Sequence, residues 1–148
     1  MSRSQEEKLQ RAKTMLDKAG LKKTNARIAF CILLLNNPTK PLSIEFMTNT
    51  LSLRGIDRVT VYRIADALSK KGILKRVDVG SREAQYEIVD QKEDHHHIIC
   101  LECKTVSDFT GCESEAIIDK ALRQVKNFKS ISHHSFDLWG LCNTCAHK

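Results

Sequence analysis

Two Cys-x-x-Cys pairs constrain this chain more than any other feature of its sequence. Cys100 and Cys103 form the first pair, Cys142 and Cys145 form the second, and 38 residues separate the two. Each pair turns the chain so that two thiol groups converge, and two pairs supply the tetrahedral sulfur set that Zn²⁺ prefers. The interval is longer than the roughly 15–20 residues of a compact zinc ribbon. The spacing therefore predicts a structural zinc that joins the start of a folded segment to its end.

Disulfides and a redox site are the alternatives to zinc. The polar segment Met1–Lys8 has no secretion signal, and no apolar run approaches the roughly 20 residues of a membrane-spanning helix. We therefore expect a cytoplasmic protein, in a reducing setting that disfavours disulfides. A thioredoxin-like site needs only one pair and leaves the second unexplained. Of the other cysteines, Cys31 is expected to be a small buried residue, whereas Cys112 is an extra ligand, a redox-sensitive thiol or a helix-start residue without a role.

Charge divides the chain near residue 82. Residues 1–82 carry 17 Lys and Arg against 7 Asp and Glu, a net charge of +10, whereas residues 83–148 carry 7 against 11, a net charge of −4. All six histidines lie in the second part. A basic half beside a half rich in metal-ligand residues favours nucleic-acid binding joined to metal binding. A basic surface that serves solubility is the alternative that charge alone leaves open.

The basic half has the pattern of a winged helix-turn-helix. Apolar residues recur at helical spacing in four segments between residues 4 and 72. From residue 73 to 89 the pattern changes to imperfect alternation around a turn, which predicts a β-hairpin. The first turn of the fourth helix offers side chains of the kinds that contact bases and phosphates, namely Arg58, Thr60, Tyr62 and Arg63. We therefore predict that this helix binds DNA, with a solvated helix end as the alternative.

The acidic half is predicted to be a small α/β unit behind a polar linker at residues 90–94. Strands are expected at 96–101, 105–109 and 130–138, and a helix is expected at 113–125. The sheet of such a unit can extend across a twofold axis.

Three consecutive histidines precede the first cysteine pair. Strand alternation sends neighbours in the run Asp94-His95-His96-His97 to opposite faces, so the run serves two different sites. On the face of His96, reasonable partners are His134, on the last predicted strand, and Glu115, in the first turn of the predicted helix. A polar strand without metal is the alternative.

Three motifs, spread over nearly the whole chain, are similar to those of one protein family. They are Ala19-Gly20-Leu21-Lys22-Lys23-Thr24-x-x-Arg27, Thr60-Val61-Tyr62-Arg63, and His95-x-His97-x-x-Cys100-x-x-Cys103 with Cys142-x-x-Cys145. The chain thus resembles the ferric-uptake-regulator family of metal-responsive repressors. The resemblance implies an α+β fold: an N-terminal winged helix-turn-helix at 1–89, a hinge at 90–94, and a small α/β dimerisation domain with structural zinc at 95–148.

The resemblance also implies which residues bind metal and DNA. The implied residues are Cys100, Cys103, Cys142 and Cys145 for structural Zn²⁺; Glu87, His95, His97 and Asp108 for a regulatory site beside the hinge; Asp94, His96, Glu115 and His134 for a second site; and, for DNA, Lys22 in the minor groove with Tyr62 and Arg63 in the major groove.

The chain departs from the family's pattern at its regulatory site. Many members supply a histidine from the loop before the third helix, where this chain has Lys40-Pro41 and no histidine. Because peroxide sensors of the family oxidise that residue, its absence weakens a peroxide-sensing interpretation. The remaining donors are imidazoles and carboxylates, which suit Fe²⁺, Mn²⁺ or Zn²⁺, and the lack of a thiolate favours Fe²⁺.

The implied function is a homodimeric, metal-dependent transcriptional repressor, most simply iron-responsive, that binds a palindromic, A·T-rich operator. Zinc-, manganese- and peroxide-responsive regulators are alternatives within the family. Two alternatives from other classes are a zinc-stabilised DNA-binding module without sensing and a zinc hydrolase. The hydrolase would leave the basic half without a purpose, and no general base is apparent. We therefore expect no enzymatic activity.

Overall fold

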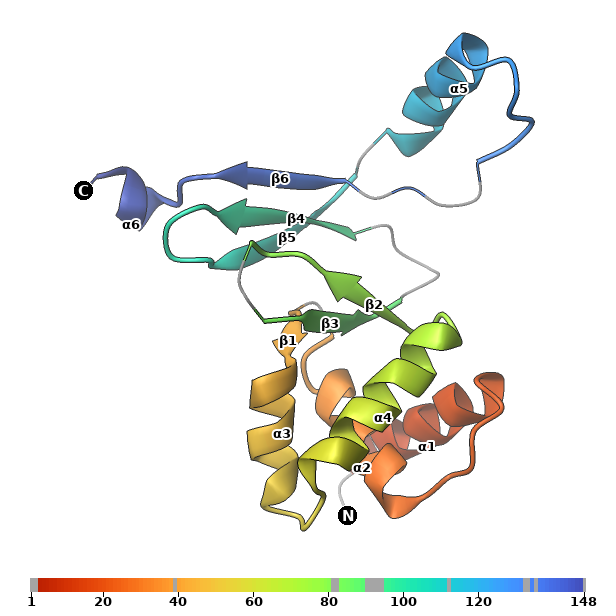
Figure 1. Ribbon diagram of the computed structural model, residues 1–148, viewed down its shortest axis with the longest axis vertical. Coiled ribbons are helices and arrows are strands. Elements are labelled where there is room, and N and C mark those ends of the chain that lie inside the picture. The colour runs from red at the N-terminus through yellow and green to blue at the C-terminus, as the bar shows by residue number, and fades with distance from the viewer. Residues whose placement is uncertain are drawn as a thin grey trace. The chain divides into compact units, whose positions relative to one another are not determined.

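The protein forms two compact units, residues 1–89 and 90–148 (Figure 1). The computed structural model describes residues 3–38, 40–80, 83–89, 95–111, 113–131, 134 and 136–147. The expected hinge at 90–94, with its candidate ligand Asp94, lies outside the described residues, and so does Cys112. Among the described helices, none combines the length and the apolar character that crossing a membrane requires.

The described residues of unit 1 include the four expected helices. They are α1 (Arg3–Lys18), α2 (Asn25–Leu35), α3 (Ile44–Ser52) and α4 (Arg58–Lys70). The side chains of Thr24, Ser43 and Asp57 accept hydrogen bonds from backbone N–H groups in the first turns of α2, α3 and α4. These caps satisfy donors that have no partner within a helix. Gly20, at φ +66°, follows α1 in the left-handed conformation that ends a helix at low cost for glycine.

A small antiparallel sheet completes unit 1. Strand β2 (Leu74–Val77) pairs with β3 (Gln85–Ile88), which confirms the predicted hairpin. On its other edge β3 pairs with β1 (Leu42–Ser43), at the start of α3. The sequence carries no signal for β1, because a strand of two residues has no alternation to detect. In the sheet order β1-β3-β2, strand β1 thus connects the hairpin of β2 and β3 to the helices.

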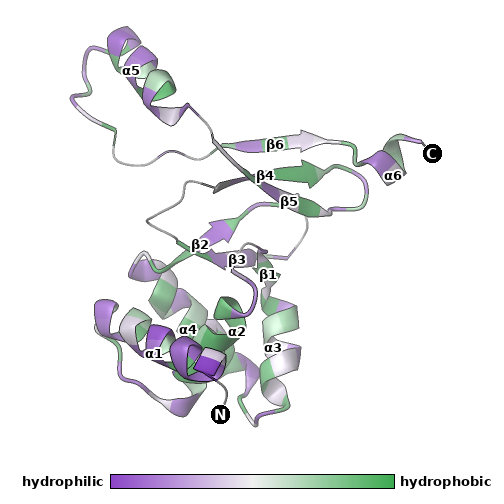
Figure 2. Ribbon diagram, turned by 180° about the vertical axis from the view of Figure 1, so that it is seen from behind, coloured by the Kyte–Doolittle hydropathy of each residue, from purple (hydrophilic) through white to green (hydrophobic). Residues whose placement is uncertain are grey.

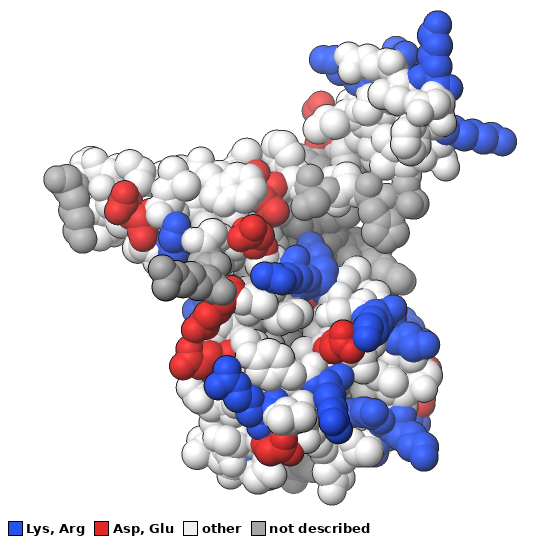
Figure 3. All heavy atoms as spheres, in the orientation of Figure 1, with Lys and Arg blue, Asp and Glu red and all other residues white. Residues whose placement is uncertain are grey.

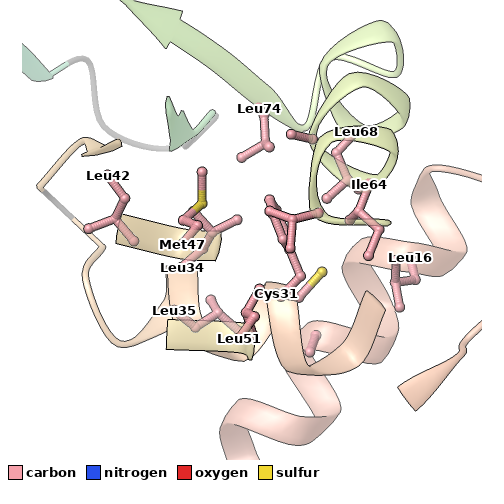
Figure 4. Packing of buried hydrophobic residues seen from close by; sticks show 14 of the residues in the cluster. Leu16, Cys31, Leu34, Leu35, Leu42, Met47, Leu51, Ile64, Leu68 and Leu74 are labelled. Atoms are coloured by element: carbon pink, nitrogen blue, oxygen red, sulfur yellow. The ribbon is translucent and has the colours of Figure 1, made fainter. Parts of the chain in front are cut away.

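The helices of unit 1 share one hydrophobic core (Figure 4). Each helix contributes a fully buried side chain, namely Leu16, Phe30, Met47 and Leu68. The residues of α2 are largely hydrophobic, whereas those of α1 are hydrophilic over much of its length (Figure 2). This difference fits the position of α2, which contacts α1, α3 and α4.

Cys31 lies in the same core, as the sequence predicts (Figure 4). Burial raises the pKa of its thiol to about 12, because the apolar surroundings disfavour the thiolate. Cys31 is therefore an uncharged packing residue.

Unit 2 is built on a second sheet with the order β5-β4-β6. The central strand β4 (His95–Cys100) is antiparallel to β5 (Val106–Thr110) and parallel to β6 (Asp137–Gly140). Helix α5 (Ser114–Gln124) lies between β5 and β6 in the sequence, and the short helix α6 (Asn143–Ala146) follows β6. Parallel strands need a long connection, which the segment containing α5 provides.

The predicted start of the last strand is wrong. The sequence predicts a strand over 130–138, but β6 begins at Asp137 and ends at Gly140. Alternation is a local pattern, whereas a strand also needs a partner to receive its hydrogen bonds. The ladder between β4 and β6 begins only at the pair His97 and Asp137.

Unit 2 exposes several large apolar side chains within a single chain. No residue of α5 is buried, although its sequence has an apolar stripe. The exposed apolar residues of this unit include Ile117, Val125, Phe128, Leu138, Trp139 and Leu141. A large exposed apolar surface marks an interaction site. These elements confirm the α+β fold class and fit a domain that dimerises.

Candidate metal sites and nucleic-acid interface

The structure brings the four cysteines of the two Cys-x-x-Cys pairs together. Cys100 ends β4, Cys103 lies in the turn that follows, Cys142 immediately precedes α6, and Cys145 lies within α6. Their Sγ atoms all lie within 4.8 Å of one another, and those of Cys103 and Cys142 are 3.7 Å apart. A tetrahedron with Zn–S bonds of about 2.3 Å has S–S edges of about 3.8 Å. The donor set and its spacing therefore fit a structural zinc.

Hydrogen bonds prepare part of this cluster for a cation. The backbone N–H of Cys142 donates to the Sγ of Cys100 at 3.4 Å. Together with the N–H of Cys103, it lowers the pKa of Cys100 to about 6. Hydrogen bonding with Thr105, whose Oγ1 lies 3.2 Å from the Sγ of Cys103, lowers the pKa of Cys103. The neighbouring Cys142 thiol raises the pKa of Cys145 to about 12. Four thiolates so close together need a dication to balance their charge, and binding it releases protons.

The described cysteines form no disulfide. A disulfide bond requires about 2.05 Å between sulfur atoms, and the Sγ atoms of Cys103 and Cys142 are nearly twice as far apart. A zinc site at the cluster of four cysteines also accounts for both Cys-x-x-Cys pairs, whereas a redox site accounts for only one pair. The geometry favours zinc over both alternatives.

The residues predicted for the regulatory site come from both units. His97 on β4 and Asp108 on β5 are direct partners in the ladder, so their side chains share one face of the sheet. The His97 side chain is buried, and Asp108 is exposed. His95 begins β4, but its side chain lies outside the described part of the chain. Glu87 belongs to β3 of unit 1, so a site that includes it stays a prediction.

Glu87 is buried and already has a cation beside it. The Nζ of Lys75 lies 2.8 Å from Oε1 of Glu87, because the two residues are opposite each other on β2 and β3. A buried carboxylate needs such a partner. A metal at this carboxylate has to compete with the Lys75 ammonium.

Two of the four residues predicted for the second site lie together. The rings of His96 and His134 are 5.3 Å apart, and Phe109 and Phe136 pack against His96 at 5.4 and 5.8 Å. Strand alternation predicts this side of β4 for His96, and His134 reaches it although it does not belong to β6. Glu115 lies in the first turn of α5 and is exposed.

Helix α4 presents four exposed side chains at its first two turns: Arg58, Val59, Tyr62 and Arg63. The Nη2 of Arg58 donates to the Oη of Tyr62 at 3.3 Å, and its guanidinium lies 5.5 Å from the centre of the Tyr62 ring. These contacts raise the pKa of Arg58. The pair forms a cationic and aromatic surface at the start of the helix.

Thr60 and Lys22 have local partners as well. The Thr60 hydroxyl donates to Oδ2 of Asp57 at 2.6 Å, and its N–H donates to Oδ1 at 2.9 Å, so its side chain serves the cap of α4. A DNA contact by Thr60 stays a prediction. Lys22 is exposed between α1 and α2, and its carbonyl accepts a hydrogen bond from Nη1 of Arg27 at 3.0 Å. Arg27 thus holds the backbone that carries Lys22.

Lys and Arg side chains are spread over much of the visible face of unit 1, with acidic groups among them (Figure 3). This distribution agrees with the positive charge of the first half of the sequence. Such a surface attracts the phosphates of nucleic acid.

Two residues near these sites are absent from the sequence-based prediction. Val59 is 58% exposed on the same side of α4 as Arg63, four residues later, and helical spacing could have identified it. Asp137 lies 3.4 Å from His97, measured from Oδ1 to Nδ1. No local signal identifies Asp137, because the contact depends on the pairing of β4 with β6.

Comparisons with known proteins agree with these features. The sequence profile of the ferric uptake regulator family matches residues 18–137. The ferric uptake regulation protein of Neisseria meningitidis is 31% identical over 135 residues, which cover 90% of this chain and 92% of the relative. The peroxide-responsive repressor PerR of Staphylococcus aureus is 25% identical over 144 residues, which cover 97% of this chain and 95% of that relative.

A solved structure also matches both units. It is the ferric uptake regulator of Helicobacter pylori, described as having three functional metal binding sites, with a TM-score of 0.74 and 29% identity over 95% of this chain and 93% of that one. The profile, the relatives and the shared fold extend over most of the chain. The chain therefore belongs to the ferric uptake regulator family of metal-dependent transcriptional repressors.

Proposed function

We propose that this protein is an iron-responsive repressor, which binds operator DNA as a homodimer when its regulatory site holds metal. The observation that carries the proposal is the pairing of His97 with Asp108 across β4 and β5, in a chain that belongs to this family. Imidazole and carboxylate donors without a thiolate suit Fe²⁺ better than a sulfur-containing site would. The relatives include regulators named for ferric uptake and for peroxide response.

The regulatory site would contain Glu87, His95, His97 and Asp108. The metal would supply positive charge to these donors when bound. Glu87, which lies beside Lys75, would contribute a carboxylate from unit 1, and His97 and Asp108 would contribute an imidazole and a carboxylate from unit 2. In this way, metal binding selects the arrangement of the two units that fits DNA.

The four cysteines would hold Zn²⁺ permanently, as the structural metal that closes unit 2. Asp94, His96, Glu115 and His134 would form the second site. His96 and His134 support this assignment, because their rings are 5.3 Å apart. The aromatic rings of Phe109 and Phe136 pack against His96, whose side chain is buried.

Helix α4 would enter the major groove of a palindromic, A·T-rich operator. Tyr62 and Arg63 would contact bases and phosphates, and the exposed methyl groups of Val59 would contact thymine methyl groups. Arg58 would support Tyr62 and Thr60 would support the cap, while Lys22 would approach the minor groove. Two such helices, one from each protomer, would read the two half-sites.

Neither a hydrolase nor a non-sensing DNA-binding module explains all of these features. A hydrolase needs an open coordination position and has no use for the cationic surface of α4. A module stabilised only by zinc needs the four cysteines but neither His97 nor Asp108. We therefore propose that the protein works in the cytoplasm as a regulator and not as an enzyme.

Operator binding under controlled metal supply tests the proposal. DNA would first be selected from a random pool with metal-loaded protein. Binding would then be measured by fluorescence anisotropy at buffered free Fe²⁺, Mn²⁺, Zn²⁺ or Co²⁺, without oxygen. Fe²⁺ should tighten binding, with a coupling typically of about 5–150-fold. The structural zinc should remain bound throughout, as measured by elemental analysis.

Two histidine variants make the test specific. His97→Ala should abolish the response to metal, whereas His147→Ala, an exposed histidine in the same unit, should retain it. A response that survives in His97→Ala would show that His97 is not a ligand of the sensing site, and unmodified protein that binds DNA equally with and without added metal would indicate the module without sensing. A stronger response to Zn²⁺ or Mn²⁺ than to Fe²⁺, at matched free concentrations, assigns the protein to another metal. Hydrolysis of test substrates by the metal-loaded protein would support the enzymatic alternative.

A further inference from the structure

A row of three polar residues crosses the sheet of unit 2. His97 on the central strand β4 is opposite Asp108 on β5 and opposite Asp137 on β6. Directly paired residues in a sheet project from the same face. The imidazole therefore lies between two carboxylates, of which only Asp108 has been assigned a role.

The contact between His97 and Asp137 is specific in its atoms. Oδ1 of Asp137 lies 3.4 Å from Nδ1 of His97. The side chain of His97 is 2% exposed and that of Asp137 is 22% exposed. Because a carboxylate only accepts hydrogen bonds when it is ionised, the position next to Asp137 favours a proton on Nδ1. The lone pair of the neutral ring is then on Nε2, the atom on the far side of the imidazole from Asp137.

We propose that Asp137 is a positioning residue of the regulatory metal site. It holds His97 in the tautomer with the proton on Nδ1 and orients the ring, so that Nε2 carries the lone pair that would bind a divalent cation. This inference rests on the proposed function in one respect, the assignment of His97 as a metal ligand. A histidine ligand usually donates its second N–H to a carboxylate or a carbonyl, and loss of that partner weakens metal binding.

The geometry favours positioning over direct ligation by Asp137. Within the described part of the chain, three or more potential ligand atoms converge only at the four cysteines. Asp108, His97 and Asp137 therefore do not surround one point. Asp137 instead makes a pairwise contact with one nitrogen of His97.

Three variants test the inference. Asp137→Ala removes the acceptor, and Asp137→Asn keeps an oxygen that accepts from Nδ1–H. Asp119→Asn, at an exposed position on α5, is the matched control for the loss of one negative charge in the same unit. Circular dichroism and zinc content verify that each variant is folded and retains its structural metal.

Two measurements are made on each variant. The first measurement is of the ¹⁵N chemical shifts of the His97 ring, which report the tautomer. It is made on protein without regulatory metal, at a pH above the ordinary histidine pKa. The second is the affinity of the regulatory site for Mn²⁺ or Co²⁺, measured by competition with a chelator. Asp137→Ala should weaken binding by about 10–100-fold and shift the proton toward Nε2. Asp137→Asn should keep the Nδ1–H tautomer and lose less affinity, and Asp119→Asn should match the unmodified protein.

Two results would overturn the inference. Unchanged tautomer and affinity in Asp137→Ala would show that the contact has no positioning role. An equal loss in Asp137→Asn and Asp137→Ala, with a changed Co²⁺ absorption spectrum, would make Asp137 a direct ligand. The variant His97→Ala distinguishes failure of the proposed function from failure of this inference. If His97→Ala keeps full metal affinity, His97 is not a ligand, whatever the tautomer measurements report for Asp137.

Discussion

Loss of the cysteine cluster should destabilise unit 2 by an amount that its position in the chain determines. The Sγ atoms of Cys103 and Cys142 are 3.7 Å apart, although the residues are 39 positions apart in the sequence. A cross-link that closes a loop of about 40 residues removes about 13 cal/mol/K of entropy from the unfolded chain, or about 4 kcal/mol near room temperature. Removing zinc, or replacing Cys142 with Ser, should therefore lower the free energy of unfolding of unit 2 by about 4 kcal/mol, close to a thousandfold in the equilibrium constant.

The sole tryptophan makes this change measurable in the full-length protein. Trp139 lies on β6, three residues before Cys142, so its fluorescence reports on unit 2. Guanidinium titrations would compare zinc-loaded protein, chelator-treated protein and Cys142→Ser. Protein concentration must be held constant, because dimerisation adds to the apparent stability.

Cys31→Ala is the matched control, because Cys31 lies in the core of unit 1. This variant should keep its zinc and its Trp139 transition. The reasoning is refuted if Cys142→Ser loses its zinc but its Trp139 transition keeps the same midpoint and slope. That result would mean that the rest of unit 2 closes the loop without the metal.

Three further predictions concern unit 1. Hydrogen bonds from Thr60 lower the pKa of Asp57, so the ionised Asp57 cap stabilises α4 at pH values above the ordinary aspartate pKa, and this contribution disappears as the pH falls through the lowered pKa. Asp57→Asn should therefore lose less stability on acidification than the unmodified protein, as measured by circular dichroism. Identical acid profiles of the two proteins would contradict this. Burial raises the pKa of Cys31 to about 12, so its thiol should resist iodoacetamide at neutral pH in the folded protein and should react once the protein is unfolded. Mass spectrometry would detect the modified cysteine. Labelling of Cys31 in the folded protein would argue against its burial. Arg63→Ala should weaken operator binding. If the Arg63 side chain neutralises one phosphate, this variant should also reduce the slope of log affinity against log salt concentration by about 0.9. Arg123→Ala, on α5, should change neither the affinity nor the slope.

Local features in the sequence were sufficient to predict much of this protein. Three segments with helical apolar spacing begin at an N-cap residue, namely Thr24, Ser43 and Asp57. Such signals depend on contacts within a few residues, so they can be recognised without the rest of the fold. The two Cys-x-x-Cys pairs are equally local, because each pair turns the chain within four residues. The helices of unit 1, its hairpin and the cysteine set could therefore be predicted from sequence alone.

Only the tertiary structure decided the relations between distant segments. The parallel pairing of β4 with β6 moves the start of the last strand to Asp137, and it brings that carboxylate to His97. The same folding of unit 2 places His134 beside His96 and the second cysteine pair beside the first. Strand alternation identifies the face on which a residue lies but not the partner opposite it, since the register is chosen by the whole sheet. The sequence thus determined which kinds of ligands this protein has, and the long-range pairing of its strands determined which of those ligands meet.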